Sequence, residues 1–118
     1  MAVTEGFKDL VKDLLADFGP VTIRNMFGGA GIYAGGVMFA ILDDDVLYLK
    51  TDETSARVFR EEGMEPFTYV MEGKGPVAMS YFEVPPRLLE APEELVAWTH
   101  EAYRVACANK TKRPRKQR

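Results

Sequence analysis

Three short apolar runs, each closed off by turn-forming residues, occupy the stretch between residues 24 and 50. Runs of this length, separated by an Ala-Gly-Gly step at 34–36 and by three aspartates at 43–45, are typical of antiparallel strands in a meander. A glycine cluster at 28–31 precedes them, where glycine indicates a positive φ, a bulge or the close approach of another backbone. The stretch therefore predicts a sheet of consecutive hairpins with the rest of the chain packed against it.

Helical patterns flank this meander. Apolar side chains recur three and four positions apart over residues 7–18, and Thr4 precedes them as a helix cap. Thr51 or Asp52 caps a second helix, and Pro92 stands in the first turn of a long third helix. The predicted elements are helices at 5–18, 53–62 and 92–109 and strands at 32–33, 37–42, 46–49, 67–71 and 77–84. Residues 21–23 are either the first strand or its lead-in. This pattern indicates a two-layer α+β fold with a largely antiparallel sheet of about five strands, in the order α-β-β-β-α-β-β-α.

The central apolar runs at 37–42 and 46–49 do not alternate with polar residues. A strand that is apolar on both sides favours cover on both faces of its sheet, and a chain this short has few helices to supply it. Burial of the second face against another copy predicts a homodimer. Cover by loops and the terminal helix is the alternative.

Length and composition indicate one domain without disulfides. The 118 residues suit a single domain, and 47% of them are hydrophobic, enough for a real core. The single cysteine, Cys107, fits a reducing cytoplasm, and the N-terminus lacks the pattern of a secretory signal. No run reaches the roughly 18 apolar residues that a membrane span requires. We expect a cytoplasmic domain over residues 1–108, followed by a disordered basic tail over 109–118.

Charge is divided unequally along the chain. All 18 acidic residues and only nine of the 15 basic ones precede residue 109. The basic residues of the tail are Lys110, Lys112, Arg113, Arg115, Lys116 and Arg118. Such a cluster can bind phosphates non-specifically through counterion release, or it can be a solvated tail. The acidic body shows no helix-turn-helix pattern, so we do not expect sequence-specific DNA recognition by the domain itself.

The glycine cluster does not fit a nucleotide-binding loop, because a strand rather than a helix follows it. Arg24 is the one basic residue close to the cluster, and it can hold an anion against exposed backbone N–H groups. Pairing with one of the many acidic residues is the alternative for this arginine.

No catalytic constellation is indicated. His100 is the only histidine and lies off the apolar stripe of its helix, while Ser55, Ser80 and Cys107 lack an evident base. The aspartates at 43–45 suit a hairpin tip, since a calcium loop needs alternating ligands and a distal glutamate. We therefore expect no catalytic residues, no metal and no cofactor.

Several sequence pieces, in order and with matching spacing, resemble the N-terminal domain of the TfoX family. The pieces are Arg24-x-Met26-Phe27-Gly28-Gly29-x-Gly31-x-Tyr33, Gly36-x-Met38-Phe39-Ala40, Leu47-Tyr48-Leu49-Lys50-x-Asp52, Pro66-Phe67-Thr68-Tyr69, Ser80-Tyr81-Phe82-x-Val84-Pro85 and Pro92-Glu93-Glu94-Leu95-x-Ala97-Trp98. The resemblance covers about residues 5–107. It implies a two-layer α+β domain linked to natural competence, in which TfoX (Sxy) proteins act with a cyclic-AMP receptor protein at promoters.

The regulators of that family carry a second, C-terminal helical domain, whereas this sequence ends at Arg118, so we expect the stand-alone form. The resemblance implies a non-enzymatic regulatory or interaction module, acting on transcription through a protein partner. Its motif supplies the candidate functional surface, which consists of Arg24, Met26, Phe27, Gly28, Gly29 and Gly31. The alternative is a small-ligand domain that holds an anion with Arg24 and the backbone of 28–31.

Overall fold

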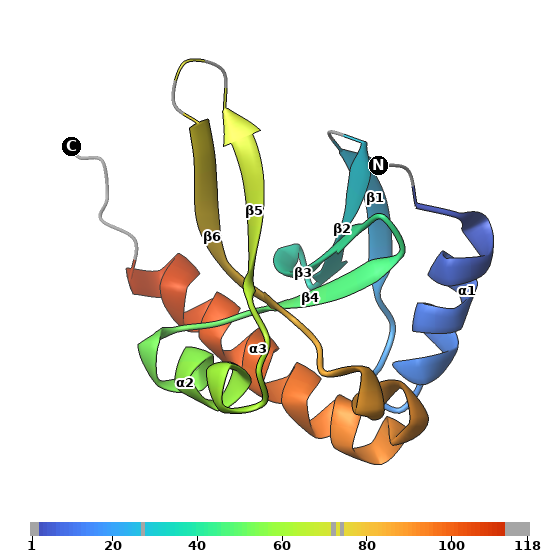
Figure 1. Cartoon of the computed structure of the whole chain (residues 1–118). Helices are drawn as coiled ribbons and strands as arrows, with labels where there is room; N and C mark the ends of the chain where they lie inside the picture. The colour runs from blue at the N-terminus through green and yellow to red at the C-terminus, as the bar shows by residue number, and fades with distance from the viewer. Residues whose placement is uncertain (1–2, 27, 72, 74, 113–118) are drawn as a thin grey trace.

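A computed structural model of the chain describes residues 3–26, 28–71, 73 and 75–112. It contains a six-stranded antiparallel sheet in the order β1-β2-β3-β4-β6-β5, with three α-helices packed against it (Figure 1). The elements are α1 (Glu5–Leu14), β1 (Thr22–Met26), β2 (Gly29–Ala34), β3 (Val37–Asp43), β4 (Val46–Lys50), α2 (Glu53–Glu61), β5 (Pro66–Met71), β6 (Gly75–Glu83), the 3-10 helix η1 (Pro86–Glu90) and α3 (Pro92–Lys112). The predicted α+β class and antiparallel sheet are confirmed.

The strand count is six rather than about five. Residues 22–26 form a complete edge strand, in which Ile23 pairs with Ile32 and Arg24 with Gly31. The polar pair Arg24-Asn25 obscured this strand in the sequence, because an edge strand exposed to water needs no apolar run.

Two helix boundaries also differ from expectation. Helix α1 ends at Leu14, and turns cover the next four residues that were predicted as helical. Helix α3 continues to Lys112 instead of fraying near Asn109. The first helix-breaking residue after Asn109 is Pro114, so nothing in the sequence stops the helix earlier. Residues 113–118 lie outside the described part, and their expected disorder stays a prediction.

Local hydrogen bonds fix the start of the first two helices. Thr4 accepts a bond from the Phe7 N–H as the cap of α1, and Asp52 forms a reciprocal capping box with Ser55 on α2. Asp45 ties the first cap to the β3–β4 hairpin, because its carboxylate accepts bonds from the Thr4 N–H at 2.9 Å and hydroxyl at 3.1 Å. The hairpin predicted at residues 43–45 is thus confirmed, and its tip anchors the N-terminal helix.

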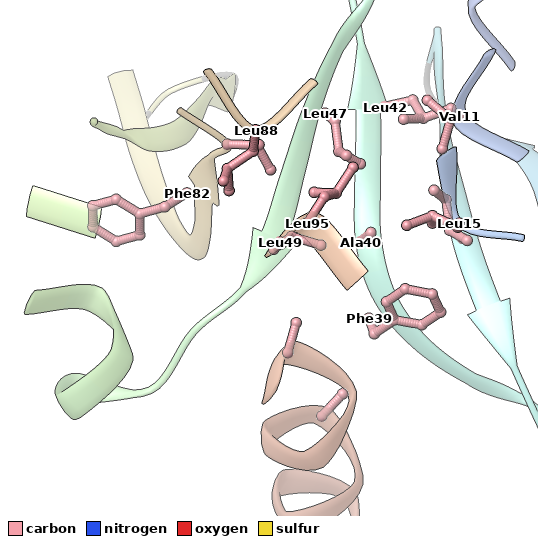
Figure 2. Close-up of a cluster of buried hydrophobic side chains, with 14 of the residues drawn as sticks. Val11, Leu15, Phe39, Ala40, Leu42, Leu47, Leu49, Phe82, Leu88 and Leu95 are labelled. Carbon is pink, nitrogen blue, oxygen red and sulfur yellow. The ribbon is translucent and has the colours of Figure 1, made fainter. Parts of the chain in front are cut away.

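The core lies between the helices and one face of the sheet. Figure 2 shows Val11 of α1 and the following Leu15 close to Phe39 and Leu42 of β3, with Leu95 of α3 near Leu49. All of these core side chains are 0% exposed. None of the helices among the described residues is long and apolar enough to cross a membrane.

A β-bulge explains part of the continuous apolar run in β3. Ile32 pairs with Ala40 and Tyr33 with Met38, so Phe39 is an extra residue on β3. Phe39 and Ala40 both lie in the core, although consecutive residues of a regular strand would point to opposite faces. The run is therefore apolar partly because the bulge directs two neighbours inward.

Candidate functional site

The two ends of the sheet diverge on the side away from α3, with β1–β2 on one side and β5–β6 on the other (Figure 1). A cleft of about 690 Å³ lies between them, and all of its described lining residues belong to strands. The apolar residues among them are Met26, Ala30, Ile41, Leu42, Phe67, Tyr69, Val70 and Met79. We call this the strand cleft.

Aromatic side chains form one wall of the strand cleft. The Phe67 ring packs edge-on against Tyr48 with centroids 5.0 Å apart and stacks with Tyr69 at 6.5 Å. Val70 lies on the same strand, the edge strand β5, and its side chain is 77% exposed. This is the highest exposed fraction among the large hydrophobic residues that the structure describes. An exposed valine beside an apolar cleft is typical of a surface that another molecule covers.

The glycine motif forms the opposite wall, and two of its glycines are required for packing. A Cβ atom on Gly29 would lie 2.5 Å from the Leu42 carbonyl oxygen, which is backbone. A Cβ atom on Gly31 would lie 2.6 Å from the Met38 sulfur. Glycine therefore allows β2 to lie close to β3 and leaves room for the side chains of Met38 and Met26. Gly28, with φ of 82°, supplies the expected positive φ before β2.

Arg24 lies on the β1–β2 hairpin that carries this motif, and it contacts an aromatic ring rather than an acidic residue. Its guanidinium is 5.5 Å from the centre of the Tyr33 ring, a cation–π contact. No ion pair of Arg24 with an acidic residue occurs among the described residues. Because β2 pairs with both β1 and β3, the backbone of Gly29–Ala34 takes part in two ladders, which leaves few N–H groups for an anion.

The middle of this sheet face is acidic in character. Burial raises the pKa of the Tyr48 phenol, and the negative charges of Glu83, Asp43 and Asp44 raise it further. The neutral phenol is therefore the stable form near neutral pH. Such surroundings favour an uncharged or cationic group on a bound molecule over a nucleic-acid phosphate.

The remaining sequence candidates do not form a site. His100 is exposed and its ring lies 4.9 Å from that of Phe18, while Ser55 serves the α2 capping box. Within residues 3–112, leaving aside 27, 72 and 74, no group of three His, Cys, Asp or Glu side chains could hold a metal ion. Phe27 of the motif and Arg113, Arg115, Lys116 and Arg118 of the tail lie outside the described residues.

Among the motif residues, the structure brings Met26 and Gly29 into the strand cleft and places Arg24 and Gly31 on the same hairpin. Sequence reasoning missed the other wall, made by Phe67, Tyr69 and Met79. The alternation of aromatic residues at 67 and 69 was a visible signal, but it could not show which strand would face them.

Comparison with known proteins supports the resemblance given by the motif. Residues 13–106 match the TfoX N-terminal domain. A protein of Aliivibrio fischeri named DNA transformation protein TfoX1 is 35% identical over 100 residues, which cover 83% of this chain and 44% of that protein. The chain thus spans less than half the length of this curated relative.

Proposed function

The chain belongs to the TfoX N-terminal domain family, and from this we propose that it is a non-enzymatic regulatory module that acts through a protein partner. The relative named as a DNA transformation protein supports competence as the process concerned. A cytoplasmic location suits such a regulator and a chain with a single cysteine, Cys107.

The observation that supports this proposal is the strand cleft. Methionine and aromatic side chains are enriched at the centres of protein interfaces, and Met26, Phe67, Tyr69 and Met79 combine both in one hollow. The cleft volume also leaves room for several apolar side chains of a partner. The expected homodimer uses the same face, because a second copy would cover the apolar residues that no helix covers.

A matched pair of charge substitutions tests this use of the cleft. Val70→Glu places a carboxylate beside the strand cleft, and Val58→Glu makes the same change on α2, where Val58 is 45% exposed. Light scattering at high protein concentration should give about twice the 13.2 kDa chain mass for wild type and Val58→Glu, and a monomer for Val70→Glu. Wild type and Val58→Glu should also capture partner proteins from a lysate of the cells of origin, and Val70→Glu should capture less of them.

Monomeric wild type together with equal capture by both variants would reject the strand cleft as the interface. Equal dimerisation of both variants would move the homodimer to another surface. A loss of binding in Val58→Glu as well would indicate a general effect of added negative charge.

A second candidate function is non-specific DNA contact by the basic tail, favoured by the charge division along the chain. Because α3 extends to Lys112, deletion of 113–118 removes four basic residues without cutting the described helix. On B-DNA this deletion should reduce the slope of log affinity against log salt by about 3.6 if all four charges bind phosphate. Equal slopes for the two chains would exclude a DNA role for these residues.

The anion alternative at Arg24 is a weaker proposal, since the ladders on both sides of β2 use its backbone groups. A thermal-shift screen of nucleotides and small acids against wild type and Arg24→Ala tests it. Stabilisation that Arg24→Ala abolishes would support an anion site there.

A further inference from the structure

A second hollow, of about 490 Å³, lies at the other end of β3, where the last turns of α3 approach the sheet. None of its described lining residues also lines the strand cleft. Lys50 at the end of β4 and Tyr81 of β6 form one side, and they are paired across the β4–β6 ladder. The other described lining residues are Gly36, the apolar Val37, Met38 and Ala106, and the polar Asn109.

Lys50 is held in place by a hydroxyl and an aromatic ring. Its ammonium nitrogen donates to the Ser80 hydroxyl at 2.7 Å and lies 5.0 Å from the centre of the Tyr81 ring. Burial lowers the pKa of Lys50, because the charged form loses part of its hydration. An ammonium group has three donors, so one hydroxyl and one ring leave it capable of binding a further acceptor.

Lys50 combines partial burial with the lack of an ion pair, and no other basic residue that the structure describes does so. The body up to residue 108 has twice as many acidic as basic residues, and the other partly buried cation, Lys8, pairs with Glu5. Exposed basic residues either form ion pairs, as Arg87 and Arg104 do, or form none among the described residues, as is the case for Lys12, Arg24, Arg57 and Arg60. No carboxylate of the described residues lies within 4 Å of the Lys50 nitrogen. A partly buried cation without an acid partner, in a hollow of small-molecule size, indicates a ligand site.

We propose that this hollow binds a small carboxylic acid, with its carboxylate on the Lys50 ammonium and its apolar body against Val37, Met38 and Ala106. A single cation balances one negative charge, and the net negative body disfavours a dianion such as a phosphate monoester. The Ser80 hydroxyl and the Asn109 amide add hydrogen-bond partners for the carboxylate. This assignment goes beyond the proposed partner interaction and does not depend on it.

The test uses the full chain, with hexanoate and benzoate as probes and inorganic phosphate as the dianionic comparison. Binding is measured by calorimetry and by the ¹³Cε resonance of Lys50 as a function of pH. Lys50→Met keeps an unbranched apolar side chain and removes the charge, and Lys12→Met on the exposed side of α1 is the matched control. We expect at least about a tenfold loss of affinity in Lys50→Met and no change in Lys12→Met.

The Lys50 resonance also reports directly on the site. A bound carboxylate should raise the Lys50 pKa, since an opposite charge favours the ammonium form. Unliganded Lys50→Met should melt no lower than wild type, because the substitution removes a partly buried charge that has no acid partner. No binding of either acid at tens of millimolar, equal binding by Lys50→Met, or a Lys50 pKa that stays unchanged at saturation would each overturn the proposal.

Discussion

Replacement of Gly29 by alanine tests why the motif needs glycine at this position. The added Cβ would be 2.5 Å from the Leu42 oxygen, against 3.4 Å or more for an ordinary contact, so β2 and β3 would have to separate by about 0.9 Å. Backbone hydrogen bonds near 2.9 Å would then exceed the usual limit of about 3.2 Å. Overpacking of a core costs about 1–3 kcal/mol and a lost hydrogen bond about 1 kcal/mol, so we expect Gly29→Ala to cost about 3 kcal/mol.

Thermal unfolding followed by circular dichroism measures this effect. For a chain of this size about 1 kcal/mol corresponds to about 4 °C, so the melting temperature should fall by about 12 °C. Gly6→Ala is the matched control, because its added Cβ would meet nothing within 4 Å apart from its chain neighbours and the backbone of its own helix α1. It should stabilise the protein by about 0.5–1 kcal/mol, since alanine restricts the unfolded chain.

Gly31 provides an internal comparison, because its added Cβ would meet a flexible side chain. The Met38 sulfur, 2.6 Å away, can move to another rotamer. Gly31→Ala should therefore cost less than Gly29→Ala, and Met38→Ala should offset part of that cost in the double variant. A melting temperature of Gly29→Ala within about 2 °C of wild type would refute the backbone-contact argument.

Three further predictions concern the surface and the buried phenol. Asp45→Ala should lower the free energy of unfolding by about 1–2 kcal/mol, because it removes both hydrogen bonds to Thr4 and places alanine at a φ of 58°. Glycine tolerates that φ, so thermal melting should show a smaller loss of stability for Asp45→Gly. Hydrogen bonds from Arg87 hold the pKa of Glu62 below its usual range, so this pair stabilises the fold above about pH 4.5, and the stabilisation is lost as the pH falls. In Arg87→Gln the melting temperature should therefore fall less steeply on the acid side of its pH profile than in wild type. Burial raises the pKa of Tyr81 to about 12, so the stability of the wild type should fall as the pH rises from about 10 to 12. The fall should be smaller in Tyr81→Phe, and an equal fall in melting temperature for both proteins would contradict this.

Local signals in the sequence were sufficient for most of the fold. The stripe of α1, the Gly35-Gly36 and Asp44-Asp45 hairpins and the proline at the start of α3 each reflect interactions within a few residues. These are the features that periodicity and turn chemistry report. The edge strand β1 was harder to place, because an edge strand with one exposed side carries little apolar pattern.

The candidate sites depended on contacts between distant parts of the chain. The strand cleft joins the 26–43 region to Phe67–Val70 only because β4 pairs with β6, with α2 and β5 intervening in sequence. Periodicity shows which residues share a strand face, but it does not show which strands become neighbours. The same limit applies to Lys50, whose lack of an acidic partner is a property of the folded arrangement.

The short ladder between β4 and β6 determines how far apart the walls of the strand cleft stand. Only three residue pairs join these strands, with Leu49 opposite Phe82 at the centre, whereas β5 and β6 share five. The twist across those three pairs sets the angle between the two ends of the sheet. Leu49 and Phe82 are core residues and are not among the described lining residues of the cleft, so repacking them would alter the width of the cleft without changing the groups that line it. The shape of the proposed interface can therefore evolve through substitutions inside the core.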